Sequence, residues 1–466
     1  MLKLIRKKHY STEFFLCFGM ILFWIISFLL LRIITNTEIG YALIFLVSYL
    51  WGMTLIWELS AKRLNLVFLF YLTFGLFIGG RFFAVLLGYS NSIWSPTFFY
   101  NYQVDIGRKI EIMHYVLGFI NSYILGYYFC RHYTLLVKEP QLSCDTLLKI
   151  NTILKWIFIP VAIYVIFQSI QTFVRATQIG YISLYLDQNQ HGGHSNILIS
   201  LLPVLLGLAV AYGDRRNRFF YLMLFVFQSL ISLFIGARGS FGSVILVLLW
   251  LYSQYHHISL KKLAVCLCCM IGVLIALASL SIRGLEGNFS EFNIWDLGLS
   301  FIYDQGVTLM VFDASRLIDN YPILPYFQSF LPGFVRMFEF FSGTQAGTDA
   351  TFAAHMCSTL NHQMYYEGYG LGWSLLCDFY LFSGRIFIIF ILISIVWGYS
   401  LGTLIHGAEQ SRLLKMICFA IIFQLLRLSR SGLNSVIPMI YYSLLIWGII
   451  ILSIQIYRKY LILRIR

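Results

Sequence analysis

Long apolar runs recur from one end of this 466-residue chain to the other. A helix of about 20 residues crosses the ~30 Å hydrocarbon core of a bilayer, and each of these runs is long enough to do so. The chain is 59% hydrophobic and only 11% charged, which is more apolar surface than a soluble domain of this length can bury. The sequence therefore predicts an all-α, polytopic membrane protein.

Basic turns between the apolar runs give the runs a direction. Lys62 with Arg63, DRRNR at 214–218 and the YRKYLILRIR tail are examples. Basic turns concentrate on the cytoplasmic side of a membrane, so the net charge of +13 is explained without a nucleic-acid partner. We expect both termini in the cytoplasm and about 12 transmembrane helices. The expected spans lie near 13–33, 39–60, 64–88, 112–130, 155–173, 196–213, 219–236, 241–255, 263–281, 384–406, 414–429 and 434–456.

One long segment, 283–383, interrupts this pattern. Up to Gly370 it holds nine acidic residues against three arginines, the reverse of the basic turns, so we expect a large periplasmic loop. Counting 371–384 (LGWSLLCDFYLFSG) as a span would put the basic tail outside, which predicts a re-entrant or surface-lying helix instead. The chain thus divides into spans 1–9 (1–282), the periplasmic loop with short or re-entrant helices (283–383) and spans 10–12 (384–466).

Arginines, and no lysines, are predicted at one depth near the outer ends of non-adjacent spans. A guanidinium stays charged at low dielectric and binds phosphate oxygens through two parallel hydrogen bonds. Snorkelling to lipid headgroups is the alternative. The pattern favours a site for an anionic ligand. Its predicted members are Arg238, Arg283, Arg427 and Arg430, with Arg81 about two turns inside the third span.

The outer segment also contains candidates for binding sugars. Tyr365, Tyr366 and Tyr369 follow one another in a glycine-rich run, and flat amphipathic rings stack on sugar faces. An interfacial aromatic belt is the alternative. Asp313 and Arg316 are polar candidates for the same role. Their i,i+3 spacing is equally typical of a surface ion pair.

The layout and two short motifs resemble a known family. Many spans, one large outer loop before the last three helices, GARGS ending a mid-chain span, and YEGYGLGWSLLCDFYLFSG after the loop are similar to Wzy-type O-antigen polymerases. They also resemble the broader oligosaccharide repeat-unit polymerases and the related ligases. The resemblance implies a GT-C-like, metal-independent glycosyltransferase. It would join undecaprenyl-diphosphate-linked oligosaccharide repeat units at the periplasmic face.

The resemblance also implies how the candidate residues would act. The arginines would bind the diphosphate, and the expected partners are a chain-length-regulating co-polymerase and a flippase. An acceptor hydroxyl needs a base or a strongly activated donor, and His362 is the first candidate, followed by Asp304 and Glu367. A histidine that bonds a loop carbonyl is the alternative for His362. His355 and His362 would lie about 10.5 Å apart on one helix, too far to share a metal ion, so we expect no metal and no other cofactor.

Two other functions fit the same sequence features. An O-antigen ligase would differ only in its acceptor. A lipid-linked oligosaccharide flippase or transporter would need a charged cavity that opens to both sides of the membrane, whereas the arginines gather at one face.

Overall fold

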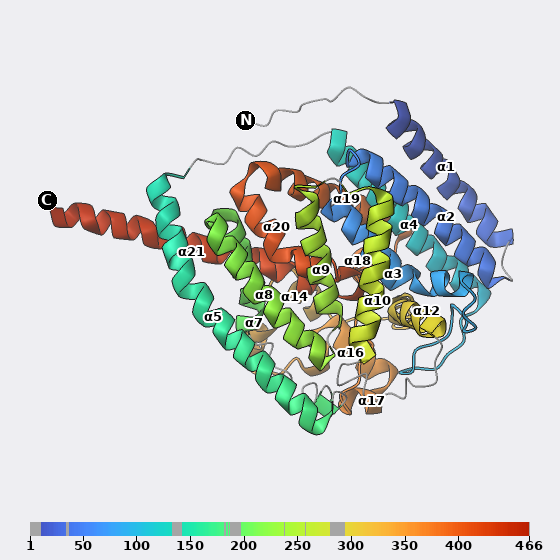
Figure 1. The fold of residues 1–466 in the computed structure, drawn as a ribbon. Coiled ribbons are helices and arrows are strands. Elements are labelled where there is room, and N and C mark those ends of the chain that lie inside the picture. Colours follow the sequence, from blue (N-terminus) through green and yellow to red (C-terminus); the bar gives the residue numbers. More distant parts are fainter. Residues whose placement is uncertain are drawn as a thin grey trace.

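The computed structural model describes residues 11–33, 37–132, 142–180, 183–184, 186, 197–236, 238–256, 258–279 and 294–465. Within these ranges the regular structure is helical, and one isolated bridge, between Thr97 and Tyr100, takes the place of any sheet. Figure 1 shows the long helices side by side, with the short helices α12 (Ile294–Gln305), α16 (Phe352–Leu360) and α17 (His362–Tyr366) toward one end. The predicted all-α architecture is confirmed.

Each predicted span coincides with one long helix of the structure. Seven of the helices are long and apolar enough to cross a membrane, namely α1, α2, α3, α5, α8, α19 and α21, while α7 and α9 are apolar but shorter. The polytopic membrane architecture is therefore confirmed, and twelve crossings remain a prediction. The helices are α1 (Ser11–Ile33), α2 (Glu38–Leu59), α3 (Leu66–Leu86), α4 (Ile106–His132), α5 (Cys144–Ile179), α7 (Ile197–Tyr212), α8 (Arg215–Ile235), α9 (Arg238–Ser253), α10 (Leu260–Ser279), α19 (Phe387–Gln410), α20 (Arg412–Leu425) and α21 (Ile437–Ile465).

Burial separates the central helices from those at the rim. In α3, 83% of the apolar window is buried inside the protein, whereas the figure is 22% for α1, α8 and α21. The apolar side chains that a rim helix leaves uncovered can be covered by lipid, which solvates them as well as protein does. The helix α3 therefore sits at the centre of the fold, and this placement matters for the arginine it carries.

Glycines allow two of the central helices to touch backbone to backbone. A Cβ atom at Gly126 of α4 would lie 2.0 Å from the carbonyl oxygen of Ile395 in α19, and one at Gly398 would lie 2.0 Å from that of Tyr123. Neither position has room for a side chain. Small residues at a helix crossing permit this close approach, which increases van der Waals contact where lipid offers no hydrophobic driving force.

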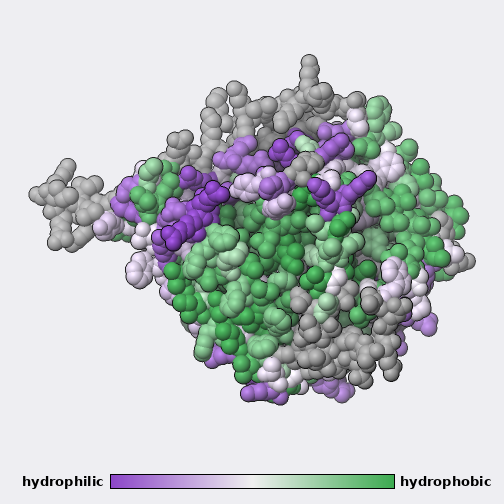
Figure 2. All heavy atoms as spheres, in the orientation of Figure 1, coloured by the Kyte–Doolittle hydropathy of each residue, from purple (hydrophilic) through white to green (hydrophobic). Residues whose placement is uncertain are grey.

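The turns between helices gather at two ends of the bundle. At one end, the turns after α2 and α9 and the last turns of α19 line a common cavity. At the other end, the connection between α3 and α4 meets the 294–382 region, and the Tyr303 hydroxyl donates to the Ser92 carbonyl at 2.6 Å. Figure 2 shows hydrophilic side chains concentrated along one edge, next to a broad hydrophobic surface. This separation is what the predicted alternation of span directions requires.

The predicted outer segment, as far as it is described, consists of short helices. These are α12 (Ile294–Gln305), α13 (Thr308–Ser315), α14 (Leu324–Phe330), α15 (Phe334–Ser342), η1 (Gly347–Ala350), α16 (Phe352–Leu360), α17 (His362–Tyr366) and α18 (Leu375–Phe382). The helix α18 has eight residues, too few to cross a bilayer, and its residues 375–381 are all buried. It packs against α4, α13 and α19, so 371–384 does not span the membrane by itself and is covered by the rest of the protein.

The last inter-span connection also differs from the prediction. The span expected at 414–429 ends at Leu425, and two 3-10 turns follow, η2 (Leu428–Arg430) and η3 (Leu433–Ser435). Residues 427–436 thus form a structured loop, here named the arginine loop because Arg427 and Arg430 lie in it.

Candidate active site

The crossing of α12 over α3 is set by two glycines. A Cβ atom at Gly80 of α3 would lie 2.4 Å from the carbonyl oxygen of Ile302, and one at Gly306 would lie 2.3 Å from the backbone nitrogen of Arg81. The two backbones therefore touch at this point. As a result, the carboxyl end of α12, with Tyr303 and the two residues that follow it, lies directly against Arg81.

Arg81 holds the connection between α3 and α4 in place. Its side chain is buried, and its Nη1 donates to the carbonyl oxygens of Ile93, at 3.0 Å, and Ser95, at 2.5 Å. Its guanidinium carbon lies 4.6 Å from the centre of the Tyr303 ring, a cation–π distance. Within the described part of the chain, its Nε is buried without a hydrogen-bond partner. This geometry gives Arg81 a positioning role, and its predicted contact with a diphosphate stays a prediction.

Arg427 and Arg430 attach the arginine loop to two other elements. Arg427 Nη1 donates to Ser240 Oγ in the first turn of α9, and Arg430 Nη1 donates to Gln305 Oε1 at the end of α12, both at 3.0 Å. The acceptors are neutral oxygens. Arg427 is half-buried, and the positive charge of Arg430 acts against its own. Two neighbouring guanidiniums in this arrangement attract an anion.

The amino end of α9 adds to this positive region. A Cβ atom at Gly239 would lie 3.9 Å from Arg427 Nε, so the guanidinium adjoins the first turn of a 16-residue helix. The first backbone N–H groups of a helix lack intrahelical acceptors, and the helix dipole favours negative charge there. Arg238 opens this helix; its side chain, and all of Arg283, lie outside the described part of the structure.

One of the three predicted proton acceptors lies beside the arginines. Asp304 is exposed, immediately precedes Gln305, and is close enough to Arg81 for its negative charge to favour the charged guanidinium. A carboxylate at this place could accept a proton near a bound anionic ligand. The structure therefore brings together the catalytic candidate Asp304 and the arginines Arg81, Arg427 and Arg430.

The other two candidates lie on a separate part of the outer end. His362 is exposed, and its ring centre lies 4.5 Å from that of Tyr366. Glu367 is also exposed and accepts a hydrogen bond from Gln363 Nε2 at 3.0 Å. Asn361, at the start of the same short helix, donates through Nδ2 to the Phe99 carbonyl at 3.0 Å, which joins α17 to the connection between α3 and α4.

The three predicted sugar-binding tyrosines lie in the last turn of this helix and just after it. The rings of Tyr365 and Tyr366 meet edge to face with centres 5.4 Å apart, and the Tyr369 ring lies 6.3 Å from that of Phe98. Tyr366 is the exposed member of the three. The aromatic surface is thus built from two connections far apart in the chain.

Asp313 and Arg316 are buried rather than on the surface. Asp313 accepts hydrogen bonds from the Tyr102 hydroxyl at 2.8 Å and from Arg108 Nη2 at 2.7 Å. Arg316 pairs with Glu111 and lies 4.0 Å from Asp313. The interpretation as a surface ion pair is therefore wrong. Because Tyr102 and Arg108 already bond both carboxylate oxygens of Asp313, the geometry favours a structural role over glycan binding.

Asp378 is a residue at the site that the sequence analysis missed. Its fully buried carboxylate accepts from Trp373 Nε1 at 2.7 Å through Oδ1 and from the Leu433 backbone nitrogen at 2.6 Å through Oδ2. Burial raises the pKa of Asp378 to about 7. Leu433 lies three residues after Arg430, so this carboxylate holds the backbone of the arginine loop through the Leu433 amide. The signal in the sequence is a lone acid inside the apolar stretch LGWSLLCDFYLFSG.

Comparison with known proteins places this arrangement in a family. The family model for the O-antigen polysaccharide polymerase Wzy matches residues 14–461, from α1 to α21. The chain belongs to this family. Searches among curated proteins and solved structures find no match. Membership of the Wzy family confirms the resemblance and implies a glycosyltransferase that polymerises polysaccharide. It thus favours a polymerase over the ligase and flippase alternatives, while the GT-C likeness stays a prediction.

Proposed function

We propose that this Wzy protein joins undecaprenyl-diphosphate-linked oligosaccharide repeat units at the periplasmic face of the inner membrane. The observation that carries the proposal is the convergence of Arg427 and Arg430 with the amino end of α9. These guanidiniums are held by the neutral side chains of Ser240 and Gln305. A diphosphate is a ligand whose charge and bidentate oxygens match such a cluster.

The reaction needs charge stabilisation more than any other assistance. The bond between the anomeric carbon of the growing glycan and its phosphate oxygen breaks, and a bond to the acceptor hydroxyl oxygen forms. The diphosphate departs with additional negative charge, while the hydroxyl proton passes to a base. Fixed guanidiniums stabilise the charge that develops on the leaving group. This scheme assigns that role to Arg427 and Arg430, with Arg238 and Arg283 as further proposed members.

The position of Asp304 supports it as the base. It lies beside Arg81 and directly before the partner of Arg430, whereas His362 and Glu367 lie on α17 and at its end. The tyrosines around α17 would then hold the sugars of the acceptor or of the growing chain through ring stacking. His362 and Glu367 would contribute hydrogen bonds to the same glycan.

The test uses a deletion strain complemented with variants and scored on a lipopolysaccharide gel. Arg427→Lys keeps the charge but removes the two-pronged contact, so we expect loss of the ladder with a single repeat retained. Ser240→Ala is the matched control, because it removes the hydrogen-bond acceptor of Arg427 but keeps the guanidinium itself, so we expect a weakened ladder rather than its loss. A normal ladder from Arg427→Lys at normal protein level would reject the diphosphate role. Core without any O-antigen in the deletion strain would indicate a ligase instead. Loss of even the single repeat, with lipid-linked units retained inside, would indicate a flippase.

The orientation is part of this proposal. We place both termini, and the end of the bundle at which the turns after α2 and α9 line a cavity, in the cytoplasm, and the arginine loop in the periplasm. The proposed partners are a chain-length-regulating co-polymerase and a flippase. A cysteine at exposed Gln345, in a background without the exposed native cysteines, should react with an impermeant reagent in intact cells. A cysteine at exposed Lys62 should react only after lysis. The reverse pattern would invert the layout.

A further inference from the structure

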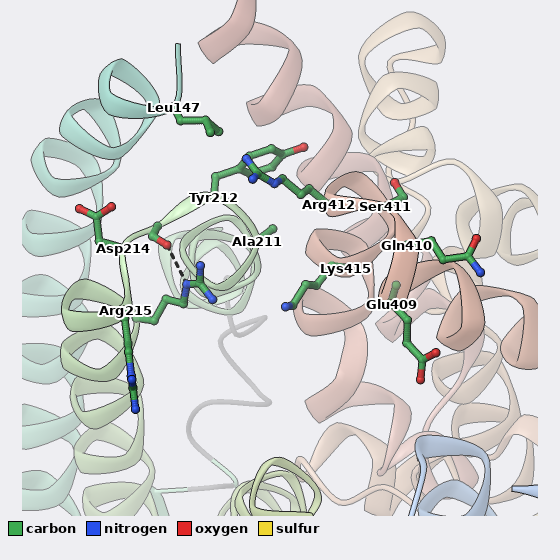
Figure 3. Close-up of a pocket in the computed structure, with 13 residues that line it drawn as sticks. Leu147, Ala211, Tyr212, Asp214, Arg215, Glu409, Gln410, Ser411, Arg412 and Lys415 are labelled. Atoms are coloured by element: carbon green, nitrogen blue, oxygen red, sulfur yellow. Dashed lines mark hydrogen bonds between the residues drawn. The ribbon is translucent and has the colours of Figure 1, made fainter. Parts of the chain in front are cut away.

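Two cavities occupy the end of the bundle opposite the arginine loop. Their volumes are about 570 Å³ and about 790 Å³. Both are lined by Arg218 from the first turn of α8, Glu409 from the end of α19 and Lys415 from the first turn of α20. Arg218 and Lys415 therefore stand where the two spaces adjoin. Figure 3 shows the smaller cavity, with Lys415 reaching into it from α20 toward α8.

Among the charged side chains that line the two cavities, lysine and arginine outnumber the acids. Arg63 and Arg131 add to the larger cavity, and Arg215 and Arg412 add to the smaller one. The acids among the lining residues are Glu409 and Asp214, and the Asp214 carboxylate already accepts a hydrogen bond from Asn151. The excess of positive charge is therefore not neutralised by the lining itself.

The cations repel one another, and two of the arginines are held in place. Lys415 is half-buried, and the charges of Arg218 and Arg412 both act against its own. Arg218 Nε donates to the Gly213 carbonyl at 2.7 Å. This hydrogen bond fixes the side chain and engages one of the guanidinium's donors. A bound anion would relieve this repulsion.

Arg131 is held by a histidine. His406 Nδ1 lies 2.9 Å from the Gly402 carbonyl, which can only accept, so this nitrogen carries the proton. His406 Nε2 is then free to accept from Arg131 Nη1, at 3.3 Å. This contact engages one terminal nitrogen of the guanidinium, so the arginine is oriented while retaining further donors for a ligand.

The turn that carries Arg63 is also fixed. Ala61 and Lys62 have φ values of 52° and 58°, a left-handed conformation that side-chain-bearing residues rarely adopt. The neighbouring Asn65 holds the turn, because its Nδ2 donates to the Tyr127 hydroxyl at 2.8 Å. The turn therefore holds Arg63 at the rim of the larger cavity.

The larger cavity has an apolar, aromatic wall as well. Trp250, Phe419 and Leu222 line it, together with the strongly exposed Phe219 near the start of α8. A small solvated anion would gain nothing from contact with apolar side chains, whereas the acyl chains of an amphipathic lipid would be buried against them. Basic pockets between membrane helices on the cytoplasmic side bind the phosphate headgroups of anionic lipids.

We propose that the two cavities bind a headgroup whose phosphate groups together carry two or more negative charges, supplied by an anionic lipid of the adjoining leaflet. The phosphate would bridge Arg218 and Lys415, and the acyl chains would follow the aromatic wall. The site is separate from the arginine loop, and its occupancy does not depend on the proposed reaction. A free diphosphate shares the headgroup chemistry, and the two sources are distinguished below.

The test measures binding to the purified full chain in a neutral detergent. The thermal unfolding midpoint is followed during titration with cardiolipin, with phosphatidylcholine as the zwitterionic control and inorganic pyrophosphate as the lipid-free probe. We expect cardiolipin to raise the midpoint, phosphatidylcholine to leave it unchanged, and Arg218→Gln with Lys415→Gln to weaken cardiolipin binding roughly 10- to 30-fold. An equal effect of pyrophosphate would assign the site to a free phosphate and keep the ligand chemistry.

The matched control is Lys261→Gln with Lys262→Gln. These lysines are exposed in the first turn of α10 and lie outside the lining of both cavities, so the same change in net charge should leave cardiolipin binding within about twofold. Equal weakening by both double variants would overturn the proposal, since binding would then follow net charge alone. If the cavity variant is not recovered folded, Arg412→Gln is compared with Lys262→Gln alone, since both residues are exposed and each change removes one positive charge.

Discussion

The two ends of the bundle both carry positive charge, but they hold it in different ways. At the cavity end, lysine and arginine are mixed, and Arg63, Arg218 and Arg412 are exposed. At the other end, Arg81 is buried and Arg427 half-buried, and both donate to neutral oxygens. The first arrangement produces a broad field that any cation can supply. The second requires the fork geometry and permanent charge of a guanidinium.

The largest expected difference comes from exchanging arginine for lysine at both ends. Arg427→Lys should lower the rate of polymerisation by about 10²–10³, because losing one fixed donor to a developing charge costs about that much. Arg218→Lys should change it by less than about twofold. The measurement is polymer formed per unit time from lipid-linked repeat units. Equal losses at both ends would remove the distinction between them.

A second, slightly smaller effect should follow from disturbing the crossing of α3 and α12. Gly306→Val places side-chain atoms where the Arg81 backbone lies, so α12 and Gln305 must shift away from Arg430. Misplacement by about 1 Å can cost roughly 10²-fold in rate. Gly298→Ala lies within α12, meets open space and is the control. Retained activity of Gly306→Val would show that α12 does not position the arginine loop.

The buried carboxyl of Asp378 should make the stability of the protein depend on pH. Its folded pKa of about 7 exceeds the ordinary 3.8, so its stabilising contribution is full below pH ~4 and is lost as the pH rises toward 7. A shift of about three units corresponds to roughly 4 kcal/mol at most. Asp378→Asn should flatten this part of the profile of unfolding midpoint against pH. It also leaves one of the two donors without its acceptor, at a cost of about 1–3 kcal/mol. An unchanged profile would mean that the carboxylate does not titrate in this window.

The smallest effect is expected for His362. This exposed ring lies on α17 rather than beside the arginine loop, so His362→Ala should reduce polymerisation by about twofold or less, while Asp304→Asn should reduce it far more. Ladder intensity at matched protein level compares the two. A larger loss from His362→Ala than from Asp304→Asn would restore the histidine as the first candidate for the base.

The sequence anticipated where these arginines gather better than it anticipated what they contact. It placed Arg81, Arg427 and Arg430 at one end from span boundaries alone, and the structure brings them together around α12. It could not distinguish the positioning role of Arg81 from the roles of Arg427 and Arg430. Arg81 donates hydrogen bonds to backbone carbonyls 12 to 14 residues further along the chain, and no local pattern indicates this contact. The sequence also treated Asp313 and Arg316 as a local pair, since Arg108 and Glu111 lie about 200 residues away.

What the sequence by itself determined are the properties that depend on neighbours along the chain. The length and apolarity of each run, the basic turns and the short motifs established the helical class, the membrane setting and the family resemblance, because a helix satisfies its own backbone hydrogen bonds wherever it lies. Only the tertiary structure decided which groups meet. The contact of Gly80 with Gly306, the bond from Leu433 to Asp378, and the cavities around Arg218 and Lys415 join segments remote in the chain. Which of these remote residues come into contact depends on how the helices pack, and no pattern of neighbouring residues encodes that packing.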